Sequence, residues 1–454
     1  MADILNTSLD ETLVRQPLGP FATRRRLLLV DARTWSPKGA FALVDQGLIS
    51  GANFIVGILL ARHLAPEQYG AYALAFQVFL FLSVGYSALV LEPLSVFGSS
   101  VYRNSNREYI GVLLRIHGVI AIVIVLGLGA CAWVLRLVAP NSDLTAALIG
   151  VTIASPCMLL FMLARRGFYV KLSPRQAALG ALGYFAVVLG GLLLAFYRDS
   201  LSPLVAFLLI AGGAGATAPL MLVRLEFSLK PRVVLLKLSE VARRHWGYGR
   251  WALGSAVAVW FSSAIYFPMI GTFRGLSATG ALQALSNFSS PIAQAFVAMS
   301  MLTLPYAAGI HHQNSSDSSR GTHHLAAKLA LIYAVGTTLY WLIIVLFRWQ
   351  IVEHLYAGRY LRIVGLIPWL AISSVLRISA TSQAIILRAM HAPLLVFVAY
   401  GAASVVDIVV GIPFTWVFGL RGSIFGMMLS SAVALAVTLV MLRRHSPSAG
   451  YLKH

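Results

Sequence analysis

Polar side chains recur at helical spacing inside apolar segments of this chain. Two stripes repeat an i, i+4, i+7, i+11 spacing, which places each set on one helix face: Gln46, Ser50, Asn53 and Gly57, and Gln283, Asn287, Ser290 and Gln294. An amide facing lipid lacks hydrogen-bond partners, so each stripe should face protein or water. A single stripe could equally serve helix packing. Because several stripes occur, we predict one shared water-filled cavity. Its predicted lining residues are Gln46, Asn53, Gln283 and Asn287.

Arg377 lies near the middle of an apolar segment that is long enough to cross a bilayer. A guanidinium at that depth cannot easily reach water, so it needs a partner. Its planar fork of donors suits phosphate, which makes Arg377 a candidate anchor for an anionic group. The alternative is a structural ion pair with Asp407, which lies at a similar depth in the next segment. The sequence favours neither interpretation.

A second group of ionisable residues lies nearer the predicted cytoplasmic side and consists of Asp45, Glu92, Arg115 and His117. A carboxylate inside a membrane segment can serve as a cation or proton site. Local pairing of Asp45 or Glu92 with Arg115 is the favoured alternative, because the charges lie at matching depth. We therefore expect Asp45, Arg115 and Asp407 to be ion-coupling residues or members of structural pairs.

The composition is that of a polytopic membrane protein. Of the 454 residues, 59% are hydrophobic and 11% are charged, with a mean hydropathy of +0.81, whereas soluble domains carry about 25% charged residues. The net charge of +20 does not indicate nucleic-acid binding, because the basic residues cluster in alternate connections. The two cysteines predict neither a disulfide framework nor a metal site. Without a P-loop, a zinc motif or a dinucleotide fingerprint, we expect neither a cofactor nor enzymatic activity.

Apolar runs of membrane-spanning length define the expected architecture. We predict an all-α integral membrane protein with twelve transmembrane helices, at 39–61, 71–93, 109–135, 144–164, 176–197, 201–223, 249–272, 280–306, 325–347, 363–388, 393–417 and 420–442. With both termini in the cytoplasm, most Lys and Arg residues fall on the cytoplasmic side, as the positive-inside rule requires. Eight arginines fall on the opposite side: Arg62, Arg136, Arg198, Arg274, Arg348, Arg359, Arg362 and Arg421.

The longest basic connection divides these spans into two halves. The predicted units are a cytoplasmic basic tail (1–38), an N-terminal six-helix lobe (39–223), a cytoplasmic basic linker (224–248), a C-terminal six-helix lobe (249–442) and a cytoplasmic tail (443–454). In the linker, residues 233–246 place apolar and basic side chains at helical spacing. This pattern is typical of an interfacial helix and equally of a solvated connection.

Short motifs carry a resemblance to a known protein family. The first half contains Asp45-Gln46, a Gly- and Asn-rich segment and ARHLAPEQYGAYALA over 61–75, and the second contains RWALGS, GALQALSNFSSPIAQAF and GLRGSIFG. The chain resembles the Wzx-like O-antigen and exopolysaccharide flippases, within the wider group of multidrug and toxin extruders and MurJ lipid flippases. The resemblance covers about residues 39–442 and implies two six-helix lobes around a central cavity. A weak repeat agrees, because Gly70-Ala71 and Gly280-Ala281 each open the second helix of a half.

The resemblance implies a flippase in the bacterial inner membrane. Such a protein translocates a polyprenyl-pyrophosphate-linked oligosaccharide for cell-surface polysaccharide biosynthesis, by alternating access of two lobes. The residues expected to bind this substrate are Arg377, Gln46, Asn53, Gln283 and Asn287. The expected partners are the lipid-linked glycan and membrane lipids, with a polysaccharide polymerase or chain-length regulator as a candidate protein partner. Nucleic acid is not expected as a partner, and a monomer is a plausible state.

Two rival functions remain open from the sequence. A cation-coupled multidrug antiporter should offer acidic residues to cationic ligands, whereas the predicted cavity contains Arg377. An integral-membrane polysaccharide-modifying enzyme such as a polymerase should have a large periplasmic loop, but the longest predicted connection on that side has about fifteen residues. Both rivals therefore fit the sequence less well than a flippase.

Overall fold

The computed structural model describes residues 20–140, 142–227, 236–296, 318–389 and 393–444, and every regular element in these ranges is helical. The first half contains α1 (Pro20–His63), α2 (Pro66–Tyr86), η1 (Ser87–Leu91), α3 (Glu92–Ser99), η2 (Arg103–Ser105), α4 (Asn106–Val138), α5 (Asp143–Val170), α6 (Pro174–Tyr197) and α7 (Pro203–Leu225). The second contains α8 (Leu238–Ala264), α9 (Tyr266–Arg274), α10 (Leu276–Asn287), α12 (Ser318–Leu346), α13 (Arg348–Tyr356), η3 (Leu361–Leu366), α14 (Ile367–Ala389), α15 (Pro393–Val406), η4 (Asp407–Gly411), α16 (Ile412–Phe418) and α17 (Leu420–Arg444).

The described helices confirm the predicted class of an all-α membrane protein. Nine of them are long and apolar enough to cross a membrane, and two bent pairs raise the number to eleven. The pairs are Ala252–Ser262 with Tyr266–Arg274, bent by 43°, and Leu331–Leu346 with Arg348–Tyr356, bent by 75°. The remaining predicted span, 280–306, begins in α10 and continues outside the described residues.

Two spans contain a π-helical turn directly before a proline. In the first half, η1 ends at Leu91 and Pro93 follows; in the second, η4 ends at Gly411 and Pro413 follows. A proline ring clashes with the carbonyl one turn earlier in a helix, and a wider turn relieves that clash. The π turn of the second half begins at Asp407, so the local proline sequence helps to aim this carboxylate.

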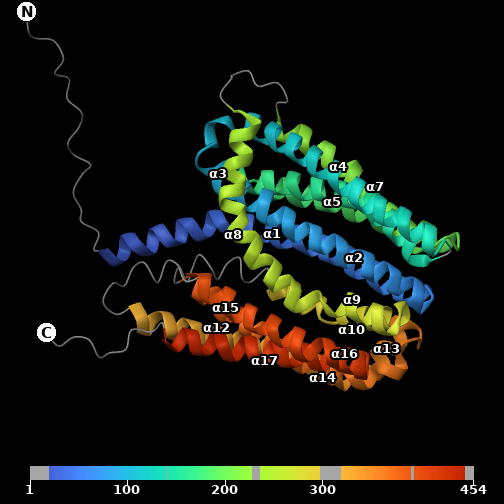
Figure 1. Cartoon of the computed structure of the whole chain (residues 1–454). Helices are drawn as coiled ribbons and strands as arrows, with labels where there is room; N and C mark the ends of the chain where they lie inside the picture. The colour runs from blue at the N-terminus through green and yellow to red at the C-terminus, as the bar shows by residue number, and fades with distance from the viewer. Residues whose placement is uncertain (1–19, 141, 228–235, 297–317, 390–392, 445–454) are drawn as a thin grey trace, which may run out of the picture.

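The helices form two groups that lie above and below one another in Figure 1. In the first, α5 packs on α7 and α4, and α1 packs on α6; in the second, α14 and α15 both pack on α17. Helix α8 joins the groups, because its first part contacts η1 and α2 while it also contacts α15. The N lobe comprises α1–α7, and the C lobe comprises α8–α17.

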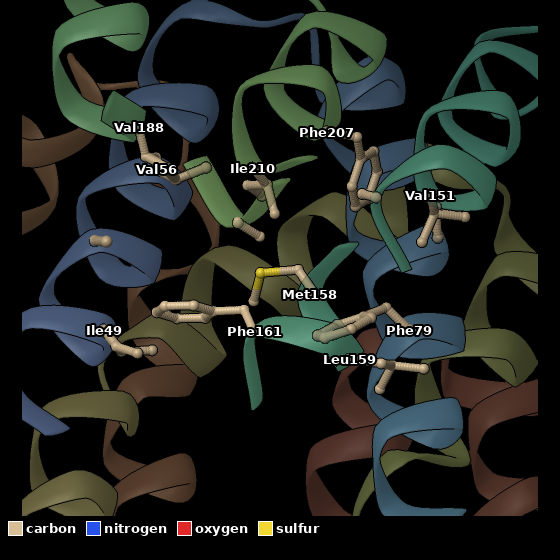
Figure 2. Close-up of a cluster of buried hydrophobic side chains, with 14 of the residues drawn as sticks. Ile49, Val56, Phe79, Val151, Met158, Leu159, Phe161, Val188, Phe207 and Ile210 are labelled. Atoms are coloured by element: carbon tan, nitrogen blue, oxygen red, sulfur yellow. The ribbon is translucent and has the colours of Figure 1, made fainter. Parts of the chain in front are cut away.

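An apolar core holds α1 and α2 in a fixed orientation within the N lobe. Figure 2 shows Ile49 and Val56 of α1 and Phe79 of α2 near Phe161 of α5 and Phe207 of α7, and all five side chains are buried. The ring centroids of Phe161 and buried Tyr184 lie 5.1 Å apart. Because the apolar faces of α1 and α2 pack into the lobe, the stripe containing Gln46 and Asn53 is left to face the C lobe.

The two lobes touch where α2 and α10 cross. A Cβ atom built on Gly70 would lie 1.7 Å from the carbonyl oxygen of Leu276, and one on Gly280 would lie 2.5 Å from that of Pro66. The two Gly-Ala pairs of the internal repeat therefore meet, and only glycine permits so close a backbone approach. This crossing, called the glycine seam below, closes the lobes together at the end opposite the chain termini.

The ends of the predicted lobes differ in detail from the expected boundaries. Helix α1 begins at Pro20, so the second half of the predicted basic tail is helical. Helix α8 begins at Leu238 and continues without interruption to Ala264. The predicted interfacial segment 233–246 therefore has its described part inside α8, while residues 228–235 lie outside the described residues.

Candidate functional site

Two adjoining cavities lie between the lobes. One has a volume of about 450 Å³ and is lined by residues of α1, α2, α10 and the helical segment 290–296. The other, of about 270 Å³, is lined by residues of α2, α8, α9, α10, α14, α17 and the segment 289–293. Four residues line both: Phe76, Leu80, Gln283 and Ser290. The two cavities thus form one continuous interlobe space, which is called the interlobe cavity below.

The predicted amide residues gather at the first part of this cavity. Asn53, Gln283 and Asn287 line it directly. Gln46 reaches it through a neighbour, because its amide nitrogen donates a 2.7 Å hydrogen bond to Oε1 of Gln294, which lines the cavity. Stripes from α1 and α10 therefore face each other across the lobe boundary.

Asn287 has a structural role as well. It is buried, and its amide nitrogen donates to the hydroxyl of Tyr69 at 2.8 Å, which ties α10 to α2 beside the glycine seam. Its Oδ1 accepts from Gln283 at 3.0 Å. Tyr356 of α13 adds a bond from its hydroxyl to the carbonyl of Ala284 at 2.8 Å. A buried amide with this many partners stabilises the contact between lobes.

Arg377 of α14 lines the second part of the cavity and its side chain is exposed there. Among the described lining residues it carries the only charge. The same part of the cavity is also lined by several serines, namely Ser262, Ser286, Ser289, Ser290, Ser373, Ser374 and Ser431. An arginine among hydroxyls offers many hydrogen-bond donors and one positive charge, which suits an oxygen-rich anion.

Asp407 does not pair with Arg377, so that predicted ion pair is wrong within the described part of the chain. Its carboxylate is fully buried, and Oδ1 accepts a 2.5 Å bond from the hydroxyl of Tyr266. Oδ2 has no hydrogen-bond partner among the described residues. Gly411 and Gly426 leave room for Tyr266, because a Cβ on either would lie within 2.4 Å of its hydroxyl. The π turn thus points Asp407 toward α9 and away from the cavity.

Asp45 is paired, but its partner is not the predicted Arg115. The carboxylate is fully buried and accepts two bonds from Arg165 of α5, from Nε at 3.0 Å and from Nη2 at 2.6 Å. The hydroxyl of Tyr169 donates a third bond at 2.6 Å. Such a bidentate pair with an added hydroxyl satisfies the buried charge. Arg115 itself lies on an exposed part of α4.

Several residues of these sites were not singled out in the sequence. Arg165 lies one residue beyond the predicted end of its span at 164, where ordinary cytoplasmic placement accounts for a basic residue. Helix α5 instead runs on to Val170 and carries Arg165 and Tyr169 on the face toward Asp45. Tyr266 gives no signal, because a tyrosine in an apolar run is ordinary. The serines near Arg377 are spread over five segments and form no motif.

The fold is shared with known transporters although the sequence is not. No protein-family model matches the chain, and no curated protein matches its sequence. Solved structures match over most of the chain. One is the inward-facing conformation of a multidrug resistance MATE family transporter of the MOP superfamily, with 13% identity and a TM-score of 0.71, covering 88% of this chain and 94% of that chain.

Two further structures have similar folds. A MOP superfamily transporter from Pyrococcus furiosus Vc1 (DSM3638), described by a reverse polarity of its binding pocket that suggests a different function, has 13% identity and a TM-score of 0.66, covering 89% of this chain and 94% of that chain. The lipid II flippase MurJ in its inward closed conformation has 12% identity and a TM-score of 0.64, covering 90% and 87%. The chain therefore has the fold found in MOP superfamily transporters.

Proposed function

We propose that this protein is a flippase that translocates a polyprenyl-pyrophosphate-linked oligosaccharide across the bacterial inner membrane for cell-surface polysaccharide biosynthesis. The observation that carries the proposal is the charge of the interlobe cavity, where Arg377 is exposed and no described acidic residue lines the wall. A pyrophosphate would meet a guanidinium that no described carboxylate pairs with. The lipid tail would remain in the bilayer while the head group crosses between the lobes.

The rest of the cavity wall suits a sugar. Amides of Asn53 and Gln283 and the serine hydroxyls near Arg377 can donate to and accept from glycan hydroxyls. The glycine seam closes the cavity at the end opposite the chain termini. With both termini in the cytoplasm, as the basic connections favour, this is a conformation that can load substrate from the cytoplasmic leaflet.

Asp407 is the better candidate for ion coupling. Asp45 has its charge neutralised by Arg165, whereas buried Asp407 accepts a hydrogen bond from the hydroxyl of Tyr266. A carboxylate in such surroundings must be protonated or bind a cation, and either event can be linked to movement of the lobes. We therefore propose Asp407, and not Asp45 or Arg115, as the ion-coupling residue.

A multidrug antiporter is the second candidate, and the aromatic part of the wall favours it. Phe54, Tyr72 and Phe76 line the first part of the cavity, and aromatic faces bind apolar and cationic ligands. The positive charge of Arg377 opposes cationic drugs, so this candidate requires ligands that are neutral or anionic.

Lipid analysis of a deletion strain tests the proposal. Loss of the protein should leave the glycan-linked polyprenyl carrier accumulated and facing the cytoplasm, and the wild-type protein should restore its export. An unchanged carrier pool, together with a drug sensitivity of the deletion strain that the wild-type protein reverses, would replace the flippase with the antiporter. Reconstituted liposomes with a labelled lipid-linked oligosaccharide then show whether this chain alone moves it.

A further inference from the structure

Arginines at the end of the molecule opposite the termini fall into two classes. Four of the eight bond to backbone carbonyls: Arg62 to His354, Arg274 to Trp416 and Val417, Arg348 to Val345, and Arg359 to Leu64. These four close helix ends or join the lobes. The other four form no hydrogen bond or ion pair with the described residues: Arg136, Arg198, Arg362 and Arg421. By the positive-inside rule, this end of the molecule should carry few positive charges. The presence of arginines that bond to no described residue there therefore needs an explanation.

Two of these unpaired arginines share one hollow. Arg362 of η3 and Arg421 of α17 both line a cavity of about 610 Å³ in the C lobe. Both side chains are exposed. This hollow is separate from the interlobe cavity and has no lining residue in common with it. Neither Arg136 nor Arg198 lines it, so two of these four arginines share the hollow and the other two do not.

The hollow also has an aromatic wall. Trp369, Phe418 and Phe425 line it, and 44% to 59% of each side chain is exposed. The rings of Trp369 and Phe425 lie 6.2 Å apart between centroids. Exposed aromatic rings at the end of a span are typical of the interface between headgroups and acyl chains. A ligand of this hollow therefore meets charge on one side and apolar surface on the other.

Backbone donors add to the positive charge. Helix α17 begins at Leu420, next to Arg421, and the N–H groups of its first turn lack acceptors within the helix. The positive end of the helix dipole therefore lies beside the two guanidinium groups. Because both guanidinium groups line one hollow, a doubly charged anion there can contact both of them.

We propose that the hollow formed by Arg362, Arg421 and Trp369 binds the phosphomonoester or pyrophosphate headgroup of a membrane lipid. The two arginines grip the phosphate oxygens, and the lipid chain lies along the exposed rings. A phosphodiester headgroup carries one negative charge and leaves one arginine unmatched, so it binds more weakly. The site does not depend on glycan transport, because it lies outside the interlobe cavity. In the proposed topology it faces the periplasmic leaflet.

Native mass spectrometry of the full chain in detergent tests this site. The lipids offered are phosphatidic acid, phosphatidylglycerol with the same acyl chains, and a polyprenyl phosphate. We expect phosphatidic acid and the polyprenyl phosphate to bind alike and phosphatidylglycerol about tenfold more weakly, because one charge-assisted contact is lost. Arg362→Gln/Arg421→Gln should reduce both phosphomonoester adducts about tenfold or more. Arg421→Lys should keep part of the binding and serves as the variant that retains charge.

The matched control is Arg136→Gln/Arg198→Gln, which removes two unpaired arginines from the same end of the molecule and should leave the adducts unchanged. Arg377→Ala should leave the phosphatidic acid adduct unchanged, which separates this site from the proposed substrate site. Equal binding of phosphatidylglycerol and phosphatidic acid would overturn the headgroup assignment. Equal losses of lipid adducts in the two double variants would show that any surface positive charge supports binding, and would overturn the site. Binding of the polyprenyl phosphate alone would overturn a site that recognises the headgroup.

Discussion

Among the residues that the structure describes, each lobe buries one carboxylate, and the partners of the two carboxylates differ. In the N lobe, Asp45 is gripped by Arg165 and Tyr169 in a closed group of three. In the C lobe, Asp407 has the hydroxyl of Tyr266, while Arg377 is exposed in the interlobe cavity. Both carboxylates are fully buried. The difference between them is therefore one of partners and not of depth.

This contrast teaches which charges are free to act. A buried pair that satisfies itself has nothing left to offer a ligand, and separating it is costly. Arg377 and Asp407 have opposite charges but are not paired, so each can still bind a ligand or an ion. The C lobe thus contains the charged residues that we assign to binding and coupling, whereas the buried charge of the N lobe is satisfied within that lobe. Three experiments can break or sharpen this division.

The largest effect is expected from Arg165→Ala, which leaves Asp45 buried without its cation. Breaking a buried pair from one side costs about 3–5 kcal/mol, so the yield of folded protein should fall sharply. Fluorescence-detected size exclusion and thermal unfolding in detergent measure this loss. Adding Asp45→Asn should recover most of the yield, because the stranded charge is removed. Arg175 is exposed, so Arg175→Ala is the matched control and should behave like the wild type. If Arg165→Ala were equally mild, the claim that Asp45 depends on its ion pair would be contradicted.

An intermediate effect, on transport and not on folding, is expected from Arg377→Ala. Because no described carboxylate pairs with Arg377, its removal strands no charge, and unfolding should change by less than about 1 kcal/mol. Flipping of a labelled lipid-linked oligosaccharide in liposomes should fall about tenfold or more, since a charge-assisted contact with phosphate is lost. Arg377→Lys should retain part of the activity. Recovery of transport in Arg377→Ala/Asp407→Ala would show that the two residues are coupled after all.

A small change in stability is expected from Asp407→Asn, and the comparison of interest is with Asp45→Asn. The amide oxygen can still accept the bond from Tyr266, so the free energy of unfolding should change by about 1 kcal/mol or less. Asp45→Asn should cost more, because it leaves the charge of Arg165 partly unpaired. Thermal unfolding of the two variants side by side measures the difference. If Asp407 couples an ion, flipping by Asp407→Asn should no longer respond to an imposed proton or sodium gradient. Equal costs for the two variants would contradict the comparison.

The sequence predicted the fold well because membrane spans are long and apolar. Nine of the described spans follow apolar runs directly, whereas the bends at Tyr266 and Arg348 had no strong signal. The stripe logic also worked for the cavity, since side chains one helical turn apart must share a face. It placed Asn53, Gln283, Asn287 and Arg377 along one continuous space. Whether they bind substrate stays a prediction.

The ion pairs were predicted less well, and the reason is geometric. Depth along a span can be counted from the sequence, but the direction around the helix axis relative to other spans cannot. Arg377 and Asp407 match in depth and face different neighbours, because the π turn before Pro413 rotates the carboxylate toward Tyr266. The predicted pair of Asp45 with Arg115 was wrong for the same reason, because Asp45 faces Arg165 instead. Arg165 was available but lay past the apolar run.

The glycine seam has a consequence for how fast the lobes can separate. At its centre the backbones of Gly70 and Gly280 lie in direct contact, so no side chain has to change rotamer at that point before α2 and α10 part. The resistance to opening is then concentrated in a few polar bonds around the seam, such as those of Asn287 with Tyr69 and Arg62 with His354. Opening should accordingly have an activation enthalpy characteristic of breaking several hydrogen bonds together. The rate of opening should depend little on the rearrangement of packed side chains.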